Sequence, residues 1–253
     1  MTRKKKVFIA VTVVLLIAAV VFLVPRLLVY LSVKNLTMVD NPPAVNFTEY
    51  DADFTCGTVK VENGLYSMEI PSDFTKTDRA SDKGSFYQRV NGDFKENIFM
   101  SETIGESFNL SDPELYDDAD SPKGISPEKI VEWFEILGHG APDSTYDTLR
   151  MISLLTRDDY SFLNLKKGTA FAAIALMKEV EFSMENTYIY EREDICGFIN
   201  MSDYADKETG AKGVYVIFEF FDTSSLDNSY IIALKTASEQ DIYAAINSVK
   251  IIK

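Results

Sequence analysis

The chain contains one histidine, His139, and this scarcity excludes several kinds of site. A histidine-rich metal centre needs more imidazoles than the chain has. A hydrolase triad would also need a nucleophile elbow of the form Gly-x-Ser-x-Gly, which the sequence lacks. Because His139 lies between two glycines and between two predicted helices, we interpret it as a loop residue; a pH-sensitive or partner-contacting loop is the alternative.

Motifs that bind nucleotides or metals are also missing. The sequence has no Walker-type loop and no glycine-rich Rossmann loop, so we expect no cofactor, and no residue stands out as catalytic. One acidic stretch contains Asp117, Asp118 and Asp120, whose oxygens are possible calcium ligands. It lacks the glycine and the terminal glutamate of an EF-hand, so we interpret it as a solvated loop, with a calcium site as the alternative.

Cysteine is scarce as well, with two residues, Cys56 and Cys196. One disulfide between them is possible if the domain lies outside the cytosol. Two buried thiols are the alternative interpretation, and the sequence alone does not choose between them.

Positive charge is sparse beyond the first 33 residues. Residues 34–253 carry 20 basic and 39 acidic side chains, a net charge of −19, whereas residues 1–33 carry five basic groups and no acid. An acidic surface of this kind repels phosphate backbones, so we expect no binding to nucleic acid. It favours basic or cation-bearing partners, although solubility alone also explains it.

The opposite composition marks the start of the chain. Residues 1–6 form a basic tail, and residues 7–24 are an apolar run without charge that spans about 27 Å as a helix, close to the hydrocarbon thickness of a bilayer. The run is longer than in a cleaved signal peptide, and Val24-Pro25-Arg26 offers no small-x-small cleavage site. We therefore predict an uncleaved transmembrane signal anchor over residues 7–33 that binds the lipid bilayer.

The basic tail also predicts the orientation of the chain. Lysine and arginine remain on the cytoplasmic side, so the N-terminus is expected in the cytoplasm and the rest outside it. The predicted location is the cell membrane, with a single pass. Residues 34–54, interrupted by Asn41-Pro42-Pro43, are predicted to be a linker, and residues 55–253 an extracytoplasmic domain.

Sequence patterns predict an α+β fold for this domain. Asn63-Gly64 and Asn91-Gly92 lie between alternating segments and predict two hairpins, the second with a longer loop. Ser126 and Pro127 predict the start of a helix that Gly138 ends. Two more helices, the third apolar on every side, precede a meander of four strands, a short helix and a final strand. This order predicts an antiparallel sheet flanked by helices.

Two short segments resemble the PsbP-like family, which includes bacterial membrane-anchored members. Tyr66-Ser67-Met68-Glu69-Ile70-Pro71-Ser72-Asp73-Phe74 is similar to the family's opening strand, and residues 246–251 are similar to its closing helix-to-strand step. The resemblance implies an α/β/α sandwich over about residues 56–253. It also implies a binding or assembly module without catalytic residues.

The function that we predict is therefore a membrane-anchored, non-catalytic module that binds a protein of the cell envelope. One alternative is an extracytoplasmic hydrolase that uses two carboxylates, which the sequence cannot pick out among 39 acids. A calcium-responsive surface protein that uses the acidic loop is the other alternative.

Overall fold

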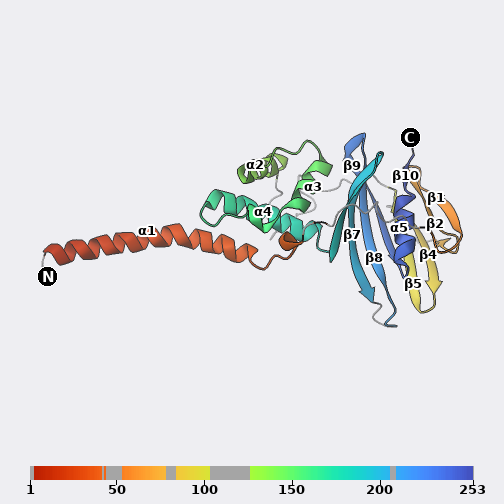
Figure 1. Ribbon diagram of the computed structural model, residues 1–253, viewed down its shortest axis with the longest axis horizontal. Helices are drawn as coiled ribbons and strands as arrows, with labels where there is room; N and C mark the ends of the chain where they lie inside the picture. The colour runs from red at the N-terminus through yellow and green to blue at the C-terminus, as the bar shows by residue number, and fades with distance from the viewer. Residues whose placement is uncertain are drawn as a thin grey trace. The chain divides into compact units, whose positions relative to one another are not determined.

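The computed structural model describes residues 3–41, 43, 53–77, 84–102, 126–205 and 209–252. Their contacts divide the chain into two compact units. The first, here called the helical unit, has described residues 3–41, 126–141 and 155–181. The remaining described residues form the second, here called the sheet unit. Figure 1 shows the elements of both.

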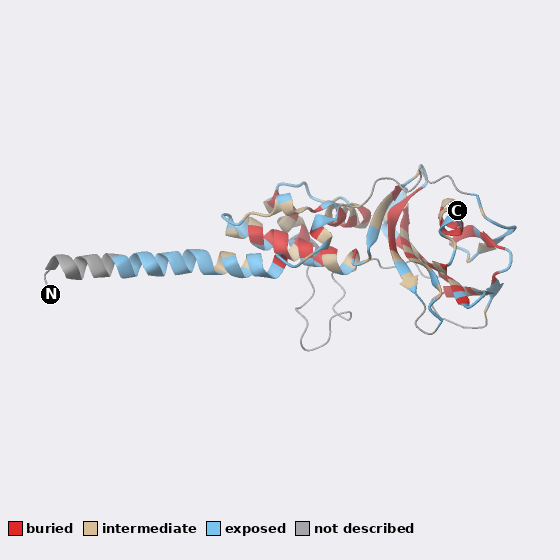
Figure 2. Cartoon of the chain, turned by 60° about the horizontal axis from the view of Figure 1, so that its bottom comes forward, coloured by how far each residue is buried: buried red, intermediate tan, exposed pale blue. Residues whose placement is uncertain are grey.

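The helical unit is built around one long helix. It contains α1 (Arg3–Val33), the short 3-10 helix η1 (Met38–Asp40), α2 (Pro127–Leu137), the 3-10 helix η4 (Arg157–Asp159) and α4 (Leu165–Glu181). Both α1 and α2 pack on α4, whose Phe171, Ile174 and Ala175 are fully buried. Figure 2 shows the long exposed part of α1 and the buried residues that gather around α4.

Within the described residues, ten strands form two antiparallel sheets. A seven-stranded sheet has the order β3-β4-β5-β9-β8-β7-β6, and a three-stranded sheet has the order β1-β2-β10. Two helices, α3 (Thr145–Leu154) and α5 (Glu239–Asn247), belong to this unit. The strands are β1 (Thr58–Glu62), β2 (Tyr66–Pro71), β3 (Thr75–Lys76), β4 (Gly84–Asn91), β5 (Phe94–Ser101), β6 (Asn186–Glu191), β7 (Ile195–Ala205), β8 (Lys212–Asp222), β9 (Ser225–Thr236) and β10 (Lys250–Ile251).

Helices of the sheet unit pack on both faces of the seven-stranded sheet, near its middle strands. Its inner face packs against α5 and β2, and Phe218 and Phe220 of β8 lie in this core. Because side chains alternate along a strand, Phe221 points to the other face, where its ring lies 5.5 Å from the ring of Tyr146 in α3. Thus β8 is a central strand. Its inner face is buried at Val216, Phe218 and Phe220, whereas the other face is buried at Phe221 and half-buried at Tyr215, Ile217 and Glu219.

The structure confirms an α+β fold with antiparallel sheets. It differs in how the first hairpin is used. β1 and β2 pair with each other but do not join the main sheet. Instead, the C-terminal β10 pairs with β2, where Tyr66 lies opposite Ile251. The second hairpin is tighter than predicted, since Asn91 pairs with Phe94 across a two-residue turn.

The first helix of the predicted domain, α2, begins and ends at the predicted residues. α2 starts at Pro127 after Ser126 and ends at Gly138, whose φ of 98° is the left-handed conformation that glycine adopts most easily. α4 is buried on most sides but not on all, because Leu176 and Val180 are exposed. The stretch that is apolar on every side, residues 169–177, predicts a buried helix, and this prediction is wrong at Leu176.

The division into units does not follow the predicted boundary at residue 55. The predicted anchor clusters with α2 and α4, because one side of its C-terminal part packs on α4. Nor are residues 34–41 an unstructured linker. They contain η1, and Val39 within it is buried.

Candidate functional site

The N-terminal helix is the clearest functional feature. Thr12–Val33 is long and apolar enough to cross a membrane, and the large apolar side chains from Val13 to Leu28 are exposed. Exposed apolar surface of this extent is unfavourable in water, so α1 is compatible with a transmembrane segment or a signal anchor. Figure 2 shows this exposure as a continuous run along α1.

The C-terminal part of α1 is held firmly by the helical unit. Arg26 Nε donates a hydrogen bond to the Leu163 carbonyl at 3.2 Å, and the rings of Tyr30 and Tyr160 lie 6.4 Å apart. Val33, one turn further along the same side, is 1% exposed. These contacts fix the helix before the chain turns away at residue 34.

Residues 36–40 are fastened to the same unit by charged groups. Arg157 donates to both carboxylate oxygens of Asp40 and, through Nη2, to the Leu36 carbonyl at 2.9 Å. The Glu179 carboxylate accepts the backbone N–H groups of Thr37 and Met38, each at 3.1 Å. We call this set of contacts the η1 clasp. The hydrogen bond from Arg157 holds the pKa of Asp40 below its usual value.

Lys178 is a buried cation of the helical unit, and its lowered pKa is a property that catalytic lysines also have. Its side chain is 2% exposed, and burial lowers its pKa to about 8, although Asp159 and Asp40 act in the opposite direction. Its Nζ donates to the Leu155 carbonyl at 2.8 Å. A catalytic lysine needs space for substrate beside the amine, whereas this amine is directed at backbone and ties α4 to the segment after α3.

His139 lies in the loop after α2, as predicted. Its Nε2 is 3.2 Å from Asp159 Oδ1, and its ring packs edge-on against Phe134. Asp159 also accepts hydrogen bonds from the backbone N–H and hydroxyl of Thr156. The histidine therefore shares a carboxylate that already caps η4, which suits a structural contact between two loops.

A buried ionic cluster joins β4, β5 and α5 in the sheet unit. Arg89 donates to Glu96 at 2.6 Å, to Asp241 at 3.2 Å and to Asp73 at 2.9 Å. Glu96 is fully buried, and Thr236 also donates to it at 2.8 Å. Burial alone would lower the pKa of Arg89, but the hydrogen bonds to the three carboxylates raise it above its usual value.

The sequence patterns do not predict this cluster. A signal existed, because Glu96 alternates with the apolar Phe94 and Ile98 along β5 and so belongs to their buried face. The partners could not be read from the sequence, since Arg89 and Asp241 lie 152 positions apart.

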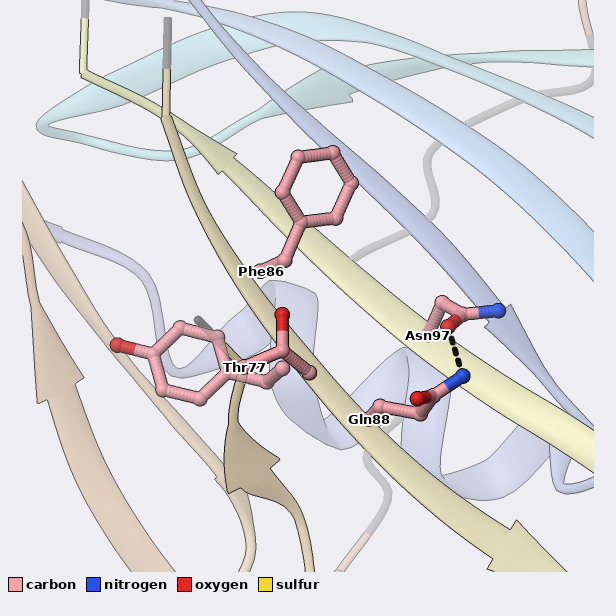
Figure 3. Close-up of a pocket in the computed structure, with 5 residues that line it drawn as sticks. Thr77, Phe86, Gln88 and Asn97 are labelled. Carbon is pink, nitrogen blue, oxygen red and sulfur yellow. Dashed lines mark hydrogen bonds between the residues drawn. The ribbon is translucent and has the colours of Figure 1, made fainter. Parts of the chain in front are cut away.

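A pocket of about 300 Å³ opens beside β3, β4 and β5, lined by Thr77, Phe86, Tyr87, Gln88 and Asn97. Figure 3 shows Gln88 directed at Asn97, and Gln88 Nε2 donates to Asn97 Oδ1 at 3.1 Å. Thr77 Oγ1 is buried and has no hydrogen-bond partner within the described part of the chain. Burial raises the pKa of Tyr87, with a smaller contribution from Glu102, so its phenol is neutral near pH 7. The described lining is therefore aromatic, hydroxyl and amide, which suits a neutral hydrogen-bonding ligand such as a peptide.

The candidate disulfide is not formed. Cys56 is an exposed free thiol and Cys196 a buried one. Cys196 lies on the face of β7 that Phe198 shares, where Tyr146 of α3 packs, whereas the backbone and hydroxyl of Thr55 bond to Asp241 of α5 on the opposite face. The sheet thus separates the two sulfurs. Burial, helped by Glu191 and Asp222, raises the pKa of Cys196 to about 12, so this thiol stays protonated.

The possible calcium ligands Asp117, Asp118 and Asp120 lie outside the described residues. Among the residues that are described, no group of three or more histidine, cysteine, aspartate or glutamate side chains could hold a metal ion. No protein-family model matches the chain, and no curated protein matches it significantly.

Proposed function

We propose that this chain is a single-pass membrane protein whose sheet unit lies outside the cytoplasm and binds a protein of the cell envelope without catalysis. The observation that carries the proposal is α1, an apolar helix that is exposed over the length of a bilayer and fastened to a folded unit at its C-terminal end. Four basic residues, Arg3 to Lys6, precede the apolar run and favour a cytoplasmic N-terminus.

Two features of the sheet unit support binding rather than catalysis. The two buried acids at the ionic cluster, Glu96 and Asp241, both accept hydrogen bonds from Arg89, and a threonine donates to each as well, so their oxygens are already engaged within the fold. The pocket beside β3, in contrast, presents uncharged groups to solvent. The resemblance to the PsbP-like family, with its sandwich of helices and sheet, is part of this proposal and agrees with a binding role.

The exposed Cys56 allows a direct test of orientation. A maleimide that cannot cross membranes, added to intact cells that produce the chain, should label the protein at Cys56. The Cys56→Ser variant should remain unlabelled, because Cys196 is buried. Labelling that appears only after the cells are permeabilised would place the sheet unit in the cytoplasm and overturn the proposed topology.

A photo-crosslinking residue at Phe86 tests the binding role. In intact cells it should give one discrete product with an envelope protein, and the same residue at the exposed Val59 of β1 serves as the control. The Gln88→Ala and Asn97→Ala substitutions together should weaken the product from Phe86. Diffuse products, or the same product from both positions, would contradict a specific partner at this pocket.

A further inference from the structure

We propose that the loop before α4, residues 160–164, is a second membrane contact that seats its apolar side chains at the boundary between the headgroups and acyl chains of the bilayer. This inference rests on the proposed function, because it requires α1 to cross the membrane. The occupant of the surface is lipid, in the leaflet on the side of the folded chain.

The loop is fixed at one level of α1. The Leu163 carbonyl accepts from Arg26, and the ring of Tyr160 packs near that of Tyr30. A methyl group added at Gly168, in the first turn of α4, would lie 3.7 Å from Val29 Cγ1, so α4 begins against the same part of the helix. Arg26 directly follows the apolar run of residues 7–24 and Pro25. The loop therefore lies where an α1 that spans the bilayer leaves its hydrocarbon core.

The side chains of the loop match that position. Leu163 is 75% exposed and Phe162 37% exposed, and neighbouring Tyr30 of α1 is 44% exposed. Large apolar and aromatic side chains of this kind are favoured at the membrane interface. Two cations, Lys166 and Lys167, follow the loop in the first turn of α4. Cations are sparse in this part of the chain, since residues 34–253 carry a net charge of −19. The charge of the two lysines complements lipid phosphates.

The same helix provides an internal control at its far end. α4 runs in the direction of α1, because Gly168 faces Val29 near its start and Glu179 bonds to Thr37 and Met38 near its end. Its 17 residues rise about 25 Å. Val180, 70% exposed, is thus as apolar and as exposed as Leu163 but lies well away from the proposed interface.

Tryptophan probes in full-length protein, reconstituted into vesicles, test the inference. The natural Trp133 is first replaced by Trp133→Phe, and one tryptophan is then introduced as Phe22→Trp, Leu163→Trp or Val180→Trp. Lipids brominated along the acyl chain should quench the fluorescence of Phe22→Trp and Leu163→Trp by about twofold or more, because both probes contact the bilayer. The fluorescence of Val180→Trp should not change.

The three probes separate the possible failures. Quenching of Phe22→Trp without quenching of Leu163→Trp would overturn the loop contact and leave the anchor standing. No quenching at Phe22→Trp would overturn the anchor itself. A Leu163→Trp probe shielded from both brominated lipid and aqueous acrylamide would mean that another protein chain covers the loop, which overturns lipid as the occupant. Circular dichroism and continued protection of Cys196 from maleimide establish that each variant is folded.

Discussion

Arg157 holds Asp40 through two parallel hydrogen bonds, Nε to Oδ1 and Nη2 to Oδ2, each 2.7 Å long. This bidentate geometry fits the planar guanidinium and is stronger than a single contact. It closes the η1 clasp and joins residues 36–40 to η4, which lies more than a hundred positions later in the chain.

The clasp should loosen in acid. The pKa of Asp40 is lowered in the folded state, so the pair stabilises the fold fully above pH 3.8, the usual value, and this contribution is lost as the pH falls through the lower folded pKa. Since both side chains are partly exposed, the contribution is about 1 kcal/mol or less. Thermal unfolding of wild type and Asp40→Asn between pH 2 and 6, in detergent micelles, should converge at the acidic end. A constant difference across this range would contradict the assignment.

Removal of the cation from the buried ionic cluster should be severe. Arg89→Met leaves Glu96 and Asp241 buried without their counter-charge, which we expect to cost about 3–5 kcal/mol in the free energy of unfolding. The matched control is Asp73→Asn, because this third partner is 62% exposed and its loss should cost about 1 kcal/mol or less. Urea unfolding monitored by circular dichroism measures both. Equal effects would show that burial does not govern the energetics of the cluster.

Stability should rise with pH through the titration of Lys178. Below pH 8 the folded and unfolded states both bind its proton, and the cost of burying the charge is fully present. Between pH 8 and 10.5 only the unfolded state binds the proton, so stability increases by up to about 3 kcal/mol across this window.

The variant Lys178→Met should lack this rise and should be the more stable protein at pH 7. The gain is partly offset, because the Leu155 carbonyl loses its donor. Unfolding curves of both proteins from pH 7 to 10.5 isolate the lysine from the other groups that titrate there. Parallel pH profiles would show that the amine is not desolvated.

A single methyl group should be tolerated at one glycine and not at another. At Gly197 in β7, an added Cβ would lie 2.2 Å from the Glu219 carbonyl oxygen and 2.7 Å from Phe220 Cα, so the paired strands must separate. We expect Gly197→Ala to cost about 3 kcal/mol or more. Gly140→Ala, where no atom lies within 4 Å of the added group, should change stability by about 0.5 kcal/mol or less. Similar unfolding midpoints for the two variants would contradict the close strand pairing.

Local signals predicted local structure well. Ser126, Pro127 and Gly138 marked the ends of α2, and alternation marked the strands on both sides of Asn63-Gly64. These features depend on interactions between residues that are close in the sequence, so a short segment is enough to predict them. The apolar composition of α1 was recognisable for the same reason.

Features that depend on distant partners were not predictable. The pairing of β2 with β10 brings together Tyr66 and Ile251, which lie near opposite ends of the domain's sequence, so no local pattern predicts it. Residues 34–41 looked like a linker because their order comes from Arg157 and Glu179, whose positions only the folded helices define. The pocket likewise needs β3 and β5 on either side of β4, which no short motif encodes.

The η1 clasp has a mechanical consequence. Arg26 bonds to the loop before α4, Val33 is buried in the helical unit, and Asp40 bonds to Arg157 of η4. The connection between α1 and the helical unit is therefore rigid. In a bilayer, a helix tilts to match its apolar length to the local thickness. If α1 spans a membrane as proposed, a change in its tilt turns α2 and α4 with it, and the thickness of that membrane sets the angle between the helical unit and the membrane surface.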